Sequence, residues 1–223
     1  MRNNGRDRDP YEVARRRMVT EQIIPGGIKD QRVLDAMMRV PRHQFVNQGM
    51  ANQAYEDRPL QIGMGQTISQ PLMVAIMTDA FGLTGSEKIL EIGTGSGYQA
   101  AILAELAKDV YTIERIDSLS IAARRVLHKL LYKNIHFRIG DGTLGWPEEA
   151  PFDGIIVTAG SPEIQKTFLN QLADGGKLVI PVGGEAVQEL VVIKKIGDRF
   201  ETKQVTGCRF VKLIGEYGWK CEE

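Results

Sequence analysis

The sequence has few cysteines, few histidines and no excess of charge of either sign. Its two cysteines, Cys208 and Cys221, have no metal-binding or redox spacing, so we expect free thiols. The three histidines are scattered along the chain, so we expect no metal site. The 28 basic and 28 acidic residues cancel, which disfavours nucleic acid as the main partner.

Long apolar runs are also absent. No run approaches the roughly 18 residues that cross a membrane, and residues 1–9 lack the apolar core of a signal peptide. We therefore expect a cytoplasmic protein that does not contact a membrane. A hydrophobic content of 43% and a charged content of 25% are typical of a globular chain, and 223 residues suit a single domain.

The most informative stretch that is present, residues 88–98, reads KILEIGTGSGY. Its apolar start predicts a buried parallel strand, and the apolar spacing after Tyr98 predicts a helix. Gly93, Gly95 and Gly97 lie between the two, where glycine permits a sharp turn and the close approach of a ligand. A strand, a glycine turn and a helix N-terminus together predict a nucleotide-type cofactor site.

The spacing of the glycines separates two classes of cofactor. A dinucleotide fingerprint would place the third glycine at position 98, which is Tyr98 in this chain. Gly97 instead completes the pattern Glu-x-Gly-x-Gly-x-Gly from Glu91. That pattern is similar to the first motif of S-adenosylmethionine-dependent methyltransferases.

Two acidic residues further along the chain favour the same cofactor. Glu114 ends a predicted strand about 20 residues after the first glycine, where a carboxylate can accept hydrogen bonds from both ribose hydroxyls. Asp141 lies in a Gly-Asp-Gly turn, where it can lie beside an adenine edge; a plain surface turn is its alternative. Because a dinucleotide fold does not require Asp141, the two residues together predict S-adenosylmethionine as the cofactor.

Strand and helix patterns alternate from residue 88 onward, which predicts a doubly wound, mostly parallel α/β sheet of the Rossmann-like type. The last three strands have no helix between them, so we expect an antiparallel C-terminal edge. The predicted strands are residues 89–92, 110–113, 135–139, 152–157, 177–181, 190–195, 200–205 and 208–213. The helices predicted between them are residues 118–131, with Ile121, Ala122, Val126 and Leu130 facing inward, and 162–172.

The N-terminal section has the pattern of a helical cap. Residues 11–24 form an amphipathic pattern, Asp30 can cap a second helix that ends before Pro41, and a third helix spans residues 72–81. Ser69 is placed as the N-cap of that third helix, with Pro71 in its first turn. We expect residues 1–82 to form a cap that binds substrate and residues 83–223 to form the cofactor-binding core of one domain.

Seven segments of the chain carry a further signal: residues 40–45, 55–71, 90–98, 111–115, 140–142, 151–153 and 171–176. The most specific element is Thr-Ile-Ser-Gln-Pro at residues 67–71. Together these segments resemble protein-L-isoaspartate O-methyltransferases, and the similarity covers nearly the whole chain after residue 11. One departure matters: the family usually has Phe-Val-Pro-Leu where residues 210–213 read Phe-Val-Lys-Leu, so Lys212 adds a charge near the expected substrate groove. Gly160-Ser161 also replaces the small alanines usual after the fourth strand.

The resemblance implies methylation of the free α-carboxylate of L-isoaspartyl residues in damaged proteins and peptides. The methyl ester then closes to a succinimide, whose hydrolysis returns part of the material to normal aspartate. The resemblance makes Ser69 the active-site serine, which orients the substrate carboxylate, and it places Tyr55 and Val211 at the substrate. The residues expected to bind the cofactor are Thr67, Ile68, Gly93, Thr94, Gly95, Gly97, Glu114, Arg115, Asp141 and Gly142.

Other functions remain open to the sequence. A methyltransferase that acts on a small molecule or RNA would keep the fold, although the balanced charge and residues 67–71 count against it. Gly97 and Asp141 disfavour a nicotinamide-dependent dehydrogenase. A binding module without turnover is a further alternative. We expect a monomer whose partners are isoaspartyl-containing proteins and peptides.

Overall fold

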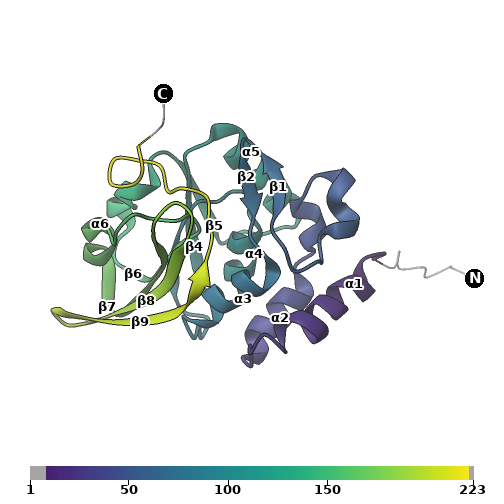
Figure 1. Cartoon of the computed structure of the whole chain (residues 1–223), viewed down its shortest axis with the longest axis horizontal. Coiled ribbons are helices and arrows are strands. Elements are labelled where there is room, and N and C mark those ends of the chain that lie inside the picture. The colour runs from purple at the N-terminus through teal and green to yellow at the C-terminus, as the bar shows by residue number, and fades with distance from the viewer. Residues whose placement is uncertain (1–8, 221–223) are drawn as a thin grey trace, which may run out of the picture.

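The computed structural model describes residues 9–220, so Cys221 and most of the polar N-terminal stretch lie outside the described residues. Seven strands form one sheet in the order β5-β4-β3-β6-β7-β8-β9 (Figure 1). They are β3 (Lys88–Ile92), β4 (Asp109–Glu114), β5 (Ile135–Ile139), β6 (Phe152–Val157), β7 (Leu172–Gly183), β8 (Gln188–Ile196) and β9 (Arg199–Cys208). The strands from β5 to β7 pair in parallel, whereas β7–β8 and β8–β9 pair antiparallel. The predicted α/β sheet with an antiparallel C-terminal edge is confirmed.

Both faces of the sheet are buried, as a doubly wound fold requires. Successive residues of β3 point to opposite faces, so Ile89 belongs to one hydrophobic cluster and Leu90 to another. The first cluster also contains residues of the N-terminal section and of α4 (Tyr98–Ala104). The second cluster also contains Phe168 of α6 (Lys166–Asn170) and Leu213.

The N-terminal section packs against the first face and carries a small hairpin (Figure 1). Its elements are α1 (Glu12–Arg17), the π-helix η1 (Met18–Ile23), α2 (Gln31–Arg39), the 3₁₀ helices η2 (Arg42–Phe45) and η3 (Gln48–Gln53), β1 (Leu60–Gly63), β2 (Gln66–Ile68) and α3 (Pro71–Asp79). Asp30 caps α2 as predicted, because its Oδ1 accepts a hydrogen bond from the amide of Arg32 at 2.8 Å. No helix among residues 9–220 is long and apolar enough to cross a membrane.

The inward face predicted for the helix after β4 is correct in part. In α5 (Asp117–Lys129) Val126, and just after the helix Leu130, are partly buried against the first hydrophobic cluster, as predicted, whereas Ile121 is 48% exposed and Ala122 is exposed. The buried positions of the helix are Leu119, Ser120, Ala123 and Leu127. Ala123 and Leu127 face Gly97 at the start of α4, where the missing Cβ leaves room for them. This close helix contact turns Ala123 and Leu127 toward the core in place of Ile121 and Ala122.

Two predicted elements near the C-terminus are also wrong. The helix predicted over residues 162–172 is reduced to α6, because Ser161 pairs its backbone with Pro181 and Gly183, and β7 already begins at Leu172. The last predicted strand, residues 208–213, does not form, since β9 ends at Cys208. Residues 209–213 instead run past the end of β6, where Gly160 exchanges hydrogen bonds with the backbone of residues 211 and 213 at 2.7 and 2.8 Å.

The strand order reverses at β3, which has β4 on one side and β6 on the other. Helices that connect parallel strands leave in opposite directions from such a point, so a crevice opens beyond the carboxyl ends of the two strands. In this chain the glycine turn follows β3, and Thr158 follows β6. The fold therefore places both segments at the position where open α/β sheets bind ligands.

Candidate active site

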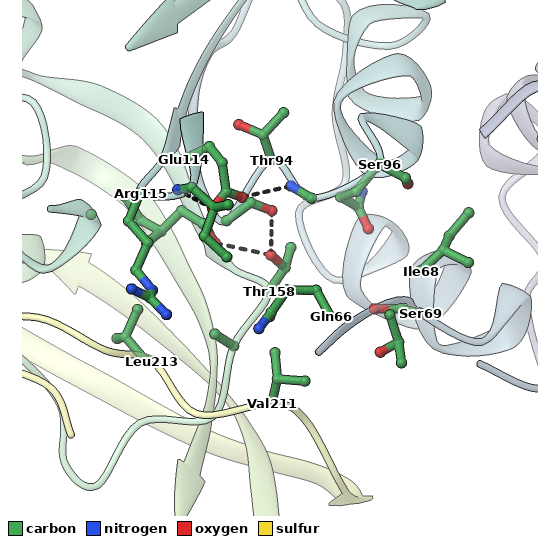
Figure 2. Close-up of a pocket in the computed structure, with 18 of the residues that line it drawn as sticks. Gln66, Ile68, Ser69, Thr94, Ser96, Glu114, Arg115, Thr158, Val211 and Leu213 are labelled. Atoms are coloured by element: carbon green, nitrogen blue, oxygen red, sulfur yellow. Dashed lines mark hydrogen bonds between the residues drawn. The ribbon is translucent and has the colours of Figure 1, made fainter. Parts of the chain in front are cut away.

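A cavity of about 770 Å³, part of it open to solvent, lies at this switch point. It is lined by the glycine turn, the ends of β4 and β6, the corner between β2 and α3, and residues 211–214 (Figure 2). The sequence-predicted site residues that line it are Thr67, Ile68, Ser69, Gly93, Thr94, Gly95, Glu114, Arg115, Gly142 and Val211. The fold thus brings together residues that are up to about 140 positions apart in the chain.

Glycine is required at position 93 for both conformation and space. The residue has a φ of +98°, and a Cβ there would lie 2.5 Å from Oγ1 of Thr158. That hydroxyl donates to the carbonyl oxygens of Gly93 at 2.6 Å and Ile92 at 3.0 Å. The end of β6 therefore fixes the start of the turn, where Gly93 presents only its backbone.

Glu114 holds the other side of the turn. Its Oε2 accepts a hydrogen bond from the amide of Gly95 at 2.9 Å, and its Oε1 accepts one from the amide of Ile116 at 3.0 Å (Figure 2). The side chain is 7% exposed and lines the cavity. Since each carboxylate oxygen can accept more than one hydrogen bond, Glu114 keeps acceptor sites for the two hydroxyls of a ribose.

A buried polar group lies beneath the turn. Oγ1 of Thr94 is 2.6 Å from Oγ1 of Thr112, which donates to Oε2 of Glu91. Burial raises the pKa of the fully buried Glu91 to about 8, an effect that the Thr112 hydrogen bond partly offsets and the nearby charge of Glu114 reinforces. Glu91 is therefore mostly protonated at neutral pH.

The corner that contains Ser69 faces the glycine turn across the cavity (Figure 2). Ser69 is not the N-cap of α3, contrary to the prediction: the N-cap position is Gln70, and Pro71 opens the helix. The capping acceptor is Oδ1 of Asp57, which takes the amide hydrogen of Leu72 at 3.0 Å. The Ser69 side chain is thereby left to line the cavity.

Three predicted site residues do not line this cavity. Asp141 Oδ1 accepts from the amide and hydroxyl of Thr143 at 2.8 and 2.6 Å, and its Oδ2 accepts from the amide of Glu216 at 2.7 Å. Burial would raise the pKa of Asp141, but these hydrogen bonds lower it below its ordinary value. Asp141 therefore ties down the C-terminal segment.

The other two residues have structural surroundings. Gly97 has a φ of +87°, and a Cβ there would lie 3.0 Å from Cδ1 of Leu127, so it serves helix packing. Tyr55 is 4% exposed, and its hydroxyl lies 2.8 Å from Nδ1 of His43 and 3.3 Å from Nη1 of Arg15. It packs between α1 and η2 within the N-terminal section.

Some cavity residues were not foreseen in the sequence. Thr158 could have been found, because it follows the strand that neighbours β3 at the switch point. Gln66, Ser96 and Leu213 carry no comparable signal. Lys212 also lines the cavity, and its Nζ lies 3.0 Å from Oε2 of Glu185 in an ion pair at the molecular surface.

The sheet, its switch point and the glycine turn with Glu114 beside it define the class of protein: a Rossmann-like methyltransferase that uses S-adenosylmethionine. The family model of protein-L-isoaspartate(D-aspartate) O-methyltransferase matches residues 14–218. The chain therefore belongs to the protein-L-isoaspartate O-methyltransferase family.

Individual relatives agree with this family. The chain is 59% identical to the protein-L-isoaspartate O-methyltransferase of Geobacter metallireducens over 214 residues, which are 96% of this chain and 99% of that protein. It is 54% identical to the Dictyoglomus thermophilum protein of the same name over 214 residues, 96% of this chain and 97% of that protein. The family match favours the predicted function over a methyltransferase for small molecules or RNA.

Solved structures have the same fold. A protein-L-isoaspartate O-methyltransferase with 28% identity superposes with a TM-score of 0.83, and the match covers 92% of this chain and 67% of that one. A Plasmodium falciparum structure, described as a putative member of the family in complex with S-adenosyl-L-homocysteine, has 24% identity and a TM-score of 0.78. That match covers 92% of this chain and 98% of the Plasmodium chain, and it shows the fold.

Proposed function

We propose that the cavity beside Ser69 carries the activity of this family, in which the residues of the sheet edge hold the donor and Ser69 orients the acceptor. The chain is an S-adenosylmethionine-dependent methyltransferase, and its substrates are proteins and peptides that contain L-isoaspartyl residues. It methylates their free α-carboxylate. The observation that carries the residue assignment is that the Ser69 corner and the glycine turn line one cavity.

The residues at the sheet edge fit the donor. A Cβ at Gly93 would collide with Thr158, so the turn requires glycine there, and the backbone that it leaves uncovered suits the amino-acid tail of S-adenosylmethionine. Glu114 can accept hydrogen bonds from the ribose, and Thr94, Gly95, Arg115 and Gly142 line the same wall. When bound, S-adenosylmethionine supplies an electrophilic methyl group on a cationic sulfur. Gly97 and Asp141 support this wall from outside the cavity.

The Ser69 corner performs the acceptor half of the reaction. A free carboxyl has an ordinary pKa near 4, so the substrate is already ionised at neutral pH and needs no general base. The hydroxyl of Ser69 can donate a hydrogen bond to one carboxylate oxygen and leave the other free to attack. Thr67 and Ile68, which are expected to contact the donor, and Val211, which is expected at the substrate, line the same cavity as Ser69 and would exclude water from it. The corner therefore only has to align the two reactants, because neither of them needs to be activated.

The methyl ester that is formed carries a better leaving group, the methoxy group, than the free carboxylate does. The backbone nitrogen that follows attacks the ester carbonyl, methanol leaves, and a succinimide ring closes. Water opens this ring to a mixture of aspartate and isoaspartate. The steps after methylation need no residue of this chain, so the enzyme initiates the repair and repeated cycles complete it.

We propose that the chain works as one domain, in which residues 1–82 form the substrate-side cap and residues 83–223 the cofactor-binding core. One hydrophobic cluster supports this view, since it contains Met18 and Met37 from the cap and Ile89 and Leu190 from the core. We also propose a cytoplasmic monomer that does not bind nucleic acid. The zero net charge and the low cysteine content support that proposal.

The proposed role of Ser69 is tested with a synthetic peptide that contains isoaspartate and the matched peptide that contains aspartate. Wild-type enzyme is expected to transfer labelled methyl groups to the first peptide only. Ser69→Ala should lower turnover by about 10-fold or more, because one orienting hydrogen bond is lost, while donor affinity measured by calorimetry stays within about twofold. Ser120→Ala, which changes a buried serine of α5 outside the cavity, is the control. A Ser69→Ala enzyme with the wild-type rate would refute the assignment.

A further inference from the structure

Arg42 is a guanidinium with no exposed surface, buried between the N-terminal section and the core. Its Nε donates to the carbonyl oxygen of Ala54 at 2.7 Å, and its Nη2 donates to the carbonyl oxygen of Ser69 at 2.7 Å. The guanidinium carbon lies 4.7 Å from the centre of the Tyr98 ring. One side chain therefore joins η3, the Ser69 corner and α4.

These contacts are unusual for a buried charge, because the hydrogen-bond acceptors are neutral carbonyl groups. Burial lowers the pKa of Arg42 to about 10, so the side chain still carries its charge at neutral pH. Moving an ion out of water costs several kcal/mol, and an apolar side chain of similar size would hold the same elements together at a lower cost. The guanidinium offers what an apolar side chain lacks, a rigid planar fork of donors that fixes two carbonyl groups at a set distance.

The segment that follows Ser69 is held as well. Oδ2 of Asp57 accepts from the side-chain amide of Gln70 at 2.7 Å, while its Oδ1 accepts from the amide of Leu72 at 3.0 Å. Asp57 thus fixes Gln70 and the first turn of α3, and Arg42 fixes the carbonyl of Ser69 itself. The Ser69 carbonyl and the start of the helix after it each have a charged hydrogen-bond partner.

We infer that Arg42 and Asp57 are positioning residues for methyl transfer, which act by fixing the backbone of Ser69 so that its hydroxyl holds the acceptor carboxylate in line with the donor. This inference rests on the orienting role proposed for Ser69. In-line transfer between two bound reactants is sensitive to small displacements, and a shift of about 1 Å can cost about 100-fold in rate. The supports of an orienting group therefore matter as much as the group itself.

Arg32 offers a comparison, since it is a half-buried arginine that, like the fully buried Arg42, donates to two backbone carbonyls. Its Nη1 donates to the carbonyl of Leu83 and its Nη2 to that of Leu106 at 3.2 Å. Neither carbonyl belongs to a residue that lines the cavity. Arg32→Lys therefore removes a similar set of contacts without touching the Ser69 corner.

A double-mutant cycle with Arg42→Lys and Ser69→Ala tests the inference. The measured quantities are kcat and KM for an isoaspartyl peptide at saturating donor, donor affinity by calorimetry, and the melting temperature. Lysine keeps the charge and loses the fork, so Arg42→Lys is expected to lower kcat/KM by about 10- to 100-fold and leave donor affinity within about twofold. In the Ser69→Ala background the same change should cost less than about threefold, because there is no hydroxyl left to misplace.

The outcomes separate this inference from the proposed function. Full activity of Ser69→Ala would refute the role of Ser69. If Ser69→Ala is impaired but Arg42→Lys lowers activity equally in both backgrounds, or not at all, the positioning role is refuted and Arg42 only joins the cap to the core. Arg32→Lys should lower the melting temperature and keep kcat/KM. If Arg42→Lys does not fold, Asp57→Asn replaces it in the double-mutant cycle. Asp57→Asn is then expected to lower kcat/KM by about 10- to 100-fold, and by less than about threefold in the Ser69→Ala background.

Discussion

Glu91→Gln should remove a pH dependence from the stability of this protein. Glu91 lies in the central strand β3 with no exposed surface. Thr112 donates to its Oε2, and among residues 9–220 no group donates a hydrogen bond to its Oε1. An ionised carboxylate is poorly supported in these surroundings, and burial raises the pKa of Glu91 from 4.5 to about 8. Glutamine has the shape of the neutral acid and cannot ionise.

The sign and size of this pH dependence follow from the pKa of Glu91 in the unfolded chain, 4.5, and in the folded chain, about 8. Between pH 4.5 and 8 the folded chain keeps a proton on Glu91 that the unfolded chain has lost, so the free energy of unfolding falls as the pH rises through this window. The stabilisation is fully present below pH 4.5 and is lost by pH 8. Each pH unit corresponds to 1.36 kcal/mol, so the expected loss between pH 5 and pH 7 is about 3 kcal/mol.

Urea denaturation of wild type and Glu91→Gln at pH 5, 6 and 7 measures this contribution, because other titrating groups cancel in the difference. The advantage of wild type over the variant should shrink by about 3 kcal/mol across the range. Glu87→Gln is the control: burial would raise the pKa of Glu87, but hydrogen bonds from Thr84 and Gly85 lower it to about 2, so its contribution is constant from pH 5 to 7. A constant difference for Glu91→Gln would mean that the buried carboxylate is ionised, and the reasoning would fail.

Two further variants test residues that lie beside the cavity. Gly97→Ala places a Cβ 3.0 Å from Leu127 in a backbone conformation with positive φ, and it should lower the free energy of unfolding by about 1–3 kcal/mol; an unchanged melting temperature would contradict this. Asp141→Asn weakens the hold on Thr143 and Glu216, so amide exchange at Glu216 should accelerate while β3 keeps its protection. Wild-type exchange combined with weaker donor binding would instead restore Asp141 to the adenine contact expected from the sequence.

The donor side of the site could be predicted because its signals are local. The strand, glycine turn and helix lie within residues 88–104, and Glu114 ends the next strand, so short-range patterns and the handedness of parallel connections place them together. The reliance on local patterns also explains the error in the predicted inward face of α5. Helix α5 has apolar residues on two stripes, and only the approach of α4 at Gly97 decides that Ala123 faces inward and Ile121 does not.

The acceptor side could be predicted only in part, because its supports come from distant residues. Ser69 was found by resemblance, but its carbonyl is held by Arg42, 27 positions earlier, and the helix after it is capped by Asp57. The sequence likewise predicts a cofactor contact for Asp141 but gives no sign that Glu216, 75 positions later, donates to its carboxylate. No local pattern marks such pairs, because the sequence Gly-Asp-Gly is the same whether or not a distant residue donates a hydrogen bond to the carboxylate.

The donor wall and the Ser69 corner are held in place by different kinds of contact, so substitutions in them should have different effects. The donor wall is built from the ends of buried parallel strands, whose positions are fixed by the whole core, so substitutions there are expected to change donor affinity or global stability. The Ser69 corner is a short connection between β2 and α3 that a few side chains fix in place. Substitutions at those side chains should therefore lower turnover at saturating donor before they lower donor affinity. On the proposed assignment the specificity for an isoaspartyl carboxylate depends on the corner, because the acceptor would be aligned there while the sheet edge would serve any methyl acceptor equally well.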